Sequence, residues 1–213
     1  MSIHPGTAGK LNHSLSLKST GLSVRIISGQ ARGRKLAPLT GIDIRPTPDR
    51  VREALFSIVL SRLGTLTDKT VLDLFAGSGA MGLEALSRGA ASAIFIDQGP
   101  QAAKVLAANL KVCSLAERGV FRPGEVIATL PRLAPRTFDL IFADPPYRSG
   151  LAEKTLHAVS RLQLLASDGL LCAETAAGEE LPERAGDLLR VDHRRYGSTA
   201  IHLYAHATEG DCA

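Results

Sequence analysis

The sequence predicts an α/β fold, in which a doubly wound, mostly parallel seven-stranded sheet ends in an antiparallel hairpin. A small hairpin and helix are expected to precede it. From residue 70 onward, apolar runs of strand length alternate with amphipathic segments of helical length. The last two runs, 188–195 and 200–205, flank a short turn at Gly197, which predicts the closing hairpin. Ligands of such sheets bind at the carboxyl ends of the strands.

The composition suits one domain with an appendage. The 213 residues divide into an expected flexible tail (1–22), a basic hairpin and helix (23–65) and a main α/β domain (66–207). No apolar run approaches the ~20 residues that span a membrane, and the N-terminus lacks a secretory core. Three cysteines without CxxC spacing and six histidines without ligand spacing predict a reducing, cytoplasmic location and no metal. We expect a monomer, since no exposed apolar heptad remains.

Positive charge is concentrated in the first third of the chain. Residues 1–70 hold 11 Lys and Arg against 4 Asp and Glu, a net charge of +7. The remaining residues hold 14 against 17, a net charge of −3, and the two parts sum to the +4 of the whole chain. A basic segment on a nearly neutral body predicts the docking of a polyanion. A solvated basic face is the alternative.

Residues 23–39 alternate and turn between Gly29 and Gly33, which predicts a β-hairpin. Basic residues on it would bind phosphates in a salt-dependent manner; they are Arg25, Arg32, Arg34 and Lys35. Prolines at 46 and 48 predict an extended lead-in to a helix over about 48–63, with Thr47 or Asp49 as its cap. Its apolar stripe (51, 55, 58, 59 and 63) leaves Arg50, Arg52 and Arg62 mostly on the other side.

Residues 70–89, TVLDLFAGSGAMGLEALSRG, predict a strand, a glycine loop and a helix, the elements of a cofactor cradle. The glycines let backbone approach a ligand, and the helix amides add donors. Residues 77–82 also fit GxGxxG, so a dinucleotide site and an ordinary tight turn are alternatives. However, Asp73 precedes the loop, and Asp97 ends the next strand, 93–97. Two carboxylates suit a nucleoside with a positive centre and no phosphate, such as S-adenosylmethionine (SAM). The candidate cofactor-binding residues are Asp73, Phe75, Ala76, Gly77, Ser78, Gly79 and Asp97.

A helix over 99–113 and a short strand over 119–122 follow, and then a buried strand over 138–143 ends in Asp144-Pro145-Pro146-Tyr147. The two prolines fix φ and remove two amide donors, so the backbone is stiff and its carbonyls can accept from a ligand. A carboxylate, rigid carbonyls and a ring together suit the exocyclic amino group of a planar base, with the ring stacked on the base. A proline-rich turn is the bland alternative. A helix over 151–165 and a strand over 169–174 complete the order.

Four stretches resemble the class I SAM-dependent methyltransferases with a D/NPP(Y/F) motif, and more narrowly the RsmD-type 16S ribosomal RNA guanine-N2 methyltransferases. They are 25–36, 45–56, the glycine-loop segment and 144–147, and the resemblance covers about 24–205. It implies methyl transfer from SAM to N2 of a guanine in 16S RNA, in the small subunit or its assembly intermediate.

The same resemblance implies roles for particular residues. Catalysis would fall to Asp144, Pro145, Pro146 and Tyr147. The hairpin would face RNA, and the helix over 48–63 would close over the cofactor, with Thr47 at the cofactor and Arg50 and Arg52 at the RNA. An acidic residue after the third strand usually contacts adenine, and here Glu125 stands where Asp is common.

Two other functions remain open from the sequence. The Asp-Pro-Pro-Tyr motif does not distinguish guanine N2 from adenine N6, so a DNA or other RNA N6-adenine methyltransferase is one alternative. An RNA-binding assembly factor without catalysis is the other, although the intact glycine loop and Asp144 argue against it.

Overall fold

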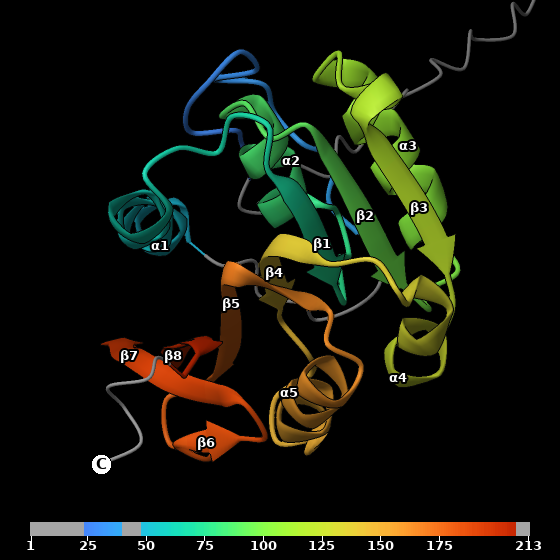
Figure 1. The fold of residues 1–213 in the computed structure, drawn as a ribbon. Coiled ribbons are helices and arrows are strands. Elements are labelled where there is room, and N and C mark those ends of the chain that lie inside the picture. The colour runs from blue at the N-terminus through green and yellow to red at the C-terminus, as the bar shows by residue number, and fades with distance from the viewer. Residues whose placement is uncertain (1–23, 40–47, 208–213) are drawn as a thin grey trace, which may run out of the picture.

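The structure, a computed structural model, describes residues 24–39 and 48–207. Over these residues one eight-stranded sheet has the order β3-β2-β1-β4-β5-β8-β7-β6 (Figure 1). The strands are β1 (Thr70–Leu74), β2 (Ser92–Asp97), β3 (Gly119–Pro123), β4 (Phe138–Ala143), β5 (Leu165–Ala176), β6 (Arg184–Ala185), β7 (Leu188–Tyr196) and β8 (Thr199–His206). Strands β1 to β5 pair in parallel, whereas β8 pairs antiparallel with both β5 and β7.

The predicted doubly wound sheet with its closing hairpin is therefore confirmed. The additional strand is β6, a two-residue piece that pairs with β7 at the sheet edge and is too short to show a hydrophobic period. The predicted helix over 151–165 ends at Arg161, and the predicted strand over 169–174 extends to 165–176.

Helices cover both faces of the sheet (Figure 1). Helices α1 (Asp49–Leu63), α2 (Ala80–Ser87) and α3 (Ala102–Val112) contribute to one apolar cluster. Helices α4 (Val126–Thr129) and α5 (Leu151–Arg161) contribute to a second cluster on the other face. Two short 3-10 turns, Ala116–Arg118 and Leu130–Leu133, complete the connections. In the described part of the chain, no helix has both the length and the apolar character needed to cross a bilayer.

The segment 24–39 folds back on itself beside α2 (Figure 1), although only one β-bridge, between Arg25 and Lys35, joins its two arms. The turn is anchored to α2 through backbone amides. The buried carboxylate of Glu84 accepts from the N–H groups of Ile27 and Ser28 at 2.7 and 2.9 Å. Ser87 accepts a third amide, that of Ala31, at 3.0 Å. The predicted hairpin is thus a loop held by a helix more than by strand pairing.

Helix α1 begins close to the predicted position but differs in its first turn. Of the two predicted caps, Thr47 lies outside the described residues, and Asp49 is the first residue of the helix, after Pro48 at the N-cap position, which makes no side-chain cap bond. Asp49 instead forms ion pairs with Arg25 and Arg52, each at 3.0 Å. The expectation that Arg52 faces RNA is wrong. Arg52 is 1% exposed, and its Nη2 donates to the Arg25 carbonyl, because position 52 shares the helix face of the buried Phe56.

Candidate active site

Four carboxylates meet at the carboxyl edge of the parallel sheet, one from each of four neighbouring strands. In sheet order they are Asp97 at the end of β2, Asp73 in β1, Asp144 directly after β4 and Glu174 in β5. The first three were predicted from the sequence, and the sheet order brings them together as expected. Neighbouring carboxylates of this set raise each other's pKa by like-charge repulsion. Asp97 raises the pKa of Asp73, and both Asp73 and Glu174 raise that of Asp144.

Asp73 is the most deeply placed of the predicted residues. Asp73 is 3% exposed, and its Oδ2 accepts the N–H of Gly82 at 2.8 Å. Desolvation raises the pKa of Asp73 to about 7, with the Gly82 bond opposing the rise and the charge of Asp97 adding to it. A carboxyl group with this pKa is poised to change its charge near neutral pH when a cation binds beside it.

The glycine loop between β1 and α2 is held by Asp97. One carboxylate oxygen accepts the Gly77 N–H at 2.8 Å, and the other accepts the Gly99 N–H at 2.6 Å. Phe75 has φ of 59° and Gly79 has φ of 80°, so the chain bends sharply on either side of Gly77.

Packing also fixes two of the glycines. A Cβ at Gly79 would lie 2.3 Å from Leu106, and one at Gly82 would lie 2.4 Å from Phe95. Room for a ligand was the predicted reason for these glycines. At Gly79 and Gly82 the close neighbours are protein side chains, whereas a Cβ at Gly77 would make only ordinary contacts, the nearest being 3.5 Å from Leu39. Phe75, Ala76, Gly77 and Ser78 are all partly exposed and available to a ligand.

The Asp144-Pro-Pro-Tyr turn follows β4, where the Asp144 N–H lies 3.4 Å from the Leu74 carbonyl. Asp144 is exposed as a residue, yet the protein atoms around its carboxyl group, and then the charges of Glu174 and Asp73, raise its pKa well above the ordinary value. Pro145 is buried and Pro146 is exposed. Tyr147 is 45% exposed, but its hydroxyl donates to Glu174 Oε1 at 2.9 Å and lies 3.0 Å from Thr199 Oγ1.

Sequence reasoning missed Glu174 and Thr199. Glu174 is 7% exposed and directly follows the apolar run Leu170–Ala173. A single acidic residue in a buried strand is the signal that would have found it, because a carboxylate is rarely buried without a partner. No comparable signal marks Thr199, which reaches Tyr147 only because β8 pairs with β5.

Glu125 serves as the N-cap of α4. Its carboxylate accepts from the N–H groups of Ile127 and Ala128 at 3.1 and 2.7 Å, which explains an acidic residue there without a ligand. Glu125 remains exposed, and its contact with adenine stays a prediction.

The predicted basic residues other than Arg52 lie at the surface. Arg25, Arg32, Arg34 and Lys35 are exposed on the segment 24–39, and Arg50 is exposed on α1. Arg25 forms a 3.0 Å ion pair with Asp49, so its charge is partly matched within the protein. Their contact with RNA stays a prediction.

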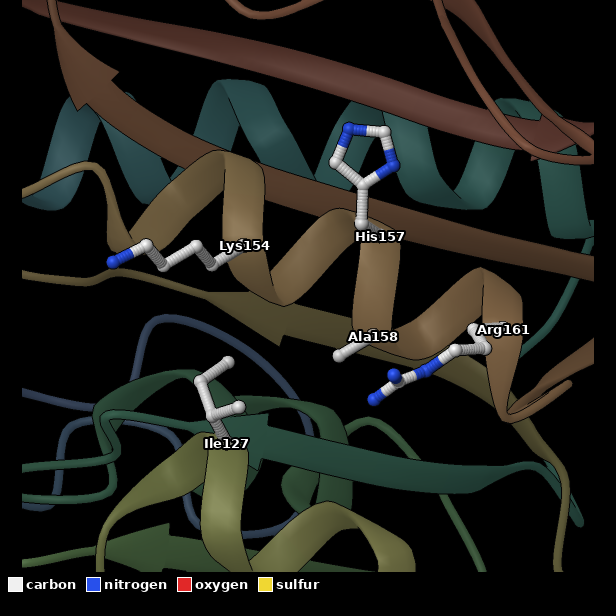
Figure 2. Close-up of a pocket in the computed structure, with 5 residues that line it drawn as sticks. All are labelled: Ile127, Lys154, His157, Ala158 and Arg161. Carbon is white, nitrogen blue, oxygen red and sulfur yellow. The ribbon is translucent and has the colours of Figure 1, made fainter.

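A depression of about 310 Å³ lies between α4 and α5 (Figure 2). Lys154 and Arg161 extend along α5 toward the side of Ile127, whereas His157 points away (Figure 2). Its lining contains none of the predicted site residues. Among residues 24–39 and 48–207, no cluster of His, Cys, Asp and Glu has the makings of a metal site.

Comparison with known proteins gives consistent similarities. Residues 24–205 match the family described as Conserved hypothetical protein 95. The YlbH protein of Bacillus subtilis is 37% identical over 184 residues, and the match covers 85% of this chain and 98% of that protein. A protein of Escherichia coli K12 named ribosomal RNA small subunit methyltransferase D is 35% identical over 188 residues, with coverages of 88% and 92%. The solved structure of the Escherichia coli protein yhhF has a TM-score of 0.74 and 35% identity, and covers 88% of this chain and 99% of that one.

Proposed function

The chain belongs to the family described as Conserved hypothetical protein 95, and on that premise we propose that it transfers a methyl group from SAM to N2 of a guanine in 16S ribosomal RNA. The chain has the class I SAM-dependent methyltransferase fold. The names of its relatives support an enzyme that methylates small-subunit ribosomal RNA. The observation that carries the proposal is that the Asp144-Pro-Pro-Tyr turn follows β4, the neighbour of the strand β1 that leads into the glycine loop, at the carboxyl edge of one sheet.

The site fits SAM by its chemistry. When bound, SAM supplies an electrophilic methyl group on a positively charged sulfur. The row of carboxylates favours a cationic ligand over a pyrophosphate, and the buried Asp73 lies at its centre. The residues that would hold the cofactor are Asp73, the loop from Phe75 to Gly79, and Asp97, with Glu125 and Thr47 as the further predicted contacts. Asp97 would do so while its oxygens hold Gly77 and Gly99 in place.

The acceptor half of the site lies at the Asp144-Pro-Pro-Tyr turn. The lone pair of guanine N2 is delocalised into the ring, so the amine needs alignment and partial relocalisation more than full deprotonation. The Asp144 carboxylate and the Pro145 carbonyl would accept hydrogen bonds from the two N–H groups of this amine. Tyr147 would stack on the base, a contact worth ~1–3 kcal/mol. Alignment of N2 with the methyl carbon supplies much of the acceleration. The proton leaves from the cationic amine, and Asp144 accepts it.

The exposed basic residues of the segment 24–39 and Arg50 would bind the phosphates around the target. We propose the small subunit or its assembly intermediate as the substrate, a monomer as the active form, and the cytoplasm as the location. We further propose the domain division into 1–22, 23–65 and 66–207, in which the second part is the RNA-facing extension. Methylation of adenine N6 is the second candidate, because the Asp144-Pro-Pro-Tyr turn by itself would bind either exocyclic amine.

Radiolabelled SAM incubated with small subunits and with naked 16S RNA, followed by nucleoside analysis, tests this function. We expect label in N2-methylguanosine. In Asp144→Ala the label should disappear while SAM binding, measured by calorimetry, survives. The matched control is Asp168→Ala, which removes an exposed carboxylate from the start of β5. Label in N6-methyladenosine would overturn the base assignment. A folded Asp144→Ala protein that no longer binds SAM would contradict the division between cofactor and acceptor residues.

A further inference from the structure

We propose that Glu174 is a positioning residue of the active site, which fixes the ring of Tyr147 through its hydroxyl group and places a second carboxylate beside Asp144. The inference rests on the proposed methyl transfer and deepens it. It assigns a role to a residue on β5 that the Asp-Pro-Pro-Tyr motif does not include.

The first step of the argument concerns the ring of Tyr147. The residue follows two prolines on an exposed turn, and 45% of it is open to solvent. Its hydroxyl is nonetheless held at 2.9 Å by Glu174 and lies 3.0 Å from Thr199. These partners come from β5 and β8, which pair directly, with Glu174 opposite Ile201 and Ala176 opposite Thr199. The tip of the ring is therefore tied to the rigid sheet, while nearly half of the residue stays available to a base.

The second step concerns the position of Glu174. A carboxylate that is 7% exposed in a central strand loses hydration, and an apolar residue would suit the surrounding run Leu170–Ala173 better. Ala173 pairs with Ala143 of β4, so Glu174 and Asp144 follow neighbouring positions on two paired strands, and the charge of Glu174 acts on Asp144.

The third step concerns the effect of that charge on Asp144. The acidic groups that face Asp144 are Glu174 from β5 and Asp73 from β1, and the hydroxyl of Tyr147 lies between the turn and β5. After burial of the carboxyl group, Glu174 makes the largest contribution to the raised pKa of Asp144. A carboxylate with a raised pKa is a stronger proton acceptor, which suits the removal of a proton from the methylated amine.

The consequence for pH dependence has a definite sign. If Asp144 must be ionised, activity is lost as pH falls through its pKa. Removal of the Glu174 charge lowers that pKa, so the acidic limb of the profile should move to lower pH. At pH values above the acidic limb, where Asp144 is fully ionised, the same change should reduce kcat, because Asp144 becomes a weaker base.

The experiment compares Glu174→Gln, Thr199→Val and the wild-type enzyme on small subunits. Glutamine keeps an oxygen acceptor for the Tyr147 hydroxyl and removes the charge, so the acidic limb of kcat should move down by about 1 pH unit, the scale of a nearby charge. Thr199→Val removes the other partner and no charge, so its limb should stay at the wild-type pH. Glu174→Asp keeps the charge and shortens the reach, so kcat should fall without a shift of the limb.

A readout without RNA separates this inference from the proposed function. The pH titration of the Asp144 carboxyl carbon, followed by ¹³C NMR in the free protein, should have a lower midpoint in Glu174→Gln than in the wild type or Thr199→Val. An unchanged midpoint in folded Glu174→Gln overturns the inference, even if the wild type methylates RNA normally. If Glu174→Gln does not fold, a shifted acidic limb in Glu174→Asp overturns it instead. A lowered midpoint in Glu174→Gln, together with a wild type that methylates no ribosomal RNA, supports the coupling of Glu174 to Asp144 and contradicts the proposed function.

Discussion

At the scale of single residues, the raised pKa of Asp73 would link protonation to the proposed binding of the cofactor. Its pKa of about 7 means that the free protein holds a neutral carboxyl group there in mildly acidic solution. A cationic ligand beside it favours the ionised form, so binding should release the proton. The same shift has a consequence for folding. Because the pKa is higher in the native state than in the unfolded chain, the native state binds the proton more tightly. The contribution of Asp73 to stability is therefore present at acidic pH and is lost as pH rises toward 7.

We predict that SAM affinity rises with pH and levels off above pH 7. Below the pKa of Asp73, each binding event must first remove its proton, so the dissociation constant at pH 6 should be about tenfold higher than at pH 8. Isothermal titration calorimetry in buffers of different ionisation enthalpy would measure both the affinity and the released proton. In Asp73→Asn, whose oxygen can still accept the Gly82 N–H, this part of the dependence should disappear. Parallel pH profiles for the two proteins would contradict the prediction.

At the scale of elements, the segment 24–39 and helix α1 depend on buried charged residues for their attachment. Glu84 on α2 accepts two amides of the segment, and Arg88 pairs with Glu84 at 2.8 Å while lying 4.7 Å from the ring centre of Phe56. Arg52 reaches from α1 to the Arg25 carbonyl. The segment predicted to face RNA is thus attached to α2 and α1 through the buried side chains of Glu84 and Arg52.

We predict that Arg52→Met lowers the free energy of unfolding by about 1–3 kcal/mol, because the Arg25 carbonyl and Asp49 lose a partner at a buried position. Burial lowers the pKa of Arg52, because desolvation disfavours the charged guanidinium, while the charges of Asp49 and Glu84 oppose the shift. Urea denaturation would measure the change. Arg50→Met is the matched control on the exposed side of the same helix, and it should change stability by less than about 0.5 kcal/mol. Equal losses in the two variants would show that Arg52 behaves as a surface residue.

At the scale of the whole molecule, charge and chemistry occupy different parts of the chain. The first 70 residues carry the net positive charge, whereas the four carboxylates of the candidate site lie on the sheet that follows them. The segment 24–39 lies beside α2, the helix that follows the glycine loop (Figure 1). This arrangement would let the basic segment attract the RNA backbone without neutralising the carboxylates that we propose for the cofactor and the base.

We predict that Arg32→Ala, Arg34→Ala and Lys35→Ala together weaken binding to 16S RNA and reduce its dependence on salt. Each lost phosphate contact should lower the slope of log K against log salt by about 0.7–0.9. Fluorescence anisotropy at several salt concentrations would measure this, and the SAM dissociation constant should stay unchanged. The control removes three other exposed arginines, Arg132, Arg136 and Arg184. An equal loss of slope in the control would mean that net charge, and not the segment 24–39, determines docking.

The sequence by itself determined the order of strands and helices, the glycine loop and three of the four carboxylates. These are local properties: alternation, helical period, glycine and proline constrain neighbouring residues whatever lies around them. Asp73, Asp97 and Asp144 could be placed at strand ends for that reason, and the order of a doubly wound sheet implies that such ends converge. Their roles at the cofactor and the base stay predictions until binding is measured.

The tertiary structure alone decided which polar residues are buried and which partners they meet. Arg52 and Arg50 look equivalent in the sequence, but only Arg52 shares a helix face with Phe56 and reaches the Arg25 carbonyl. Glu174 joins the site because β5 lies between β4 and β8, so that the Tyr147 hydroxyl meets Glu174, 27 residues away in the chain, and Thr199, 52 residues away. Burial and electrostatic coupling depend on elements far apart in the chain, and a local pattern carries no record of them.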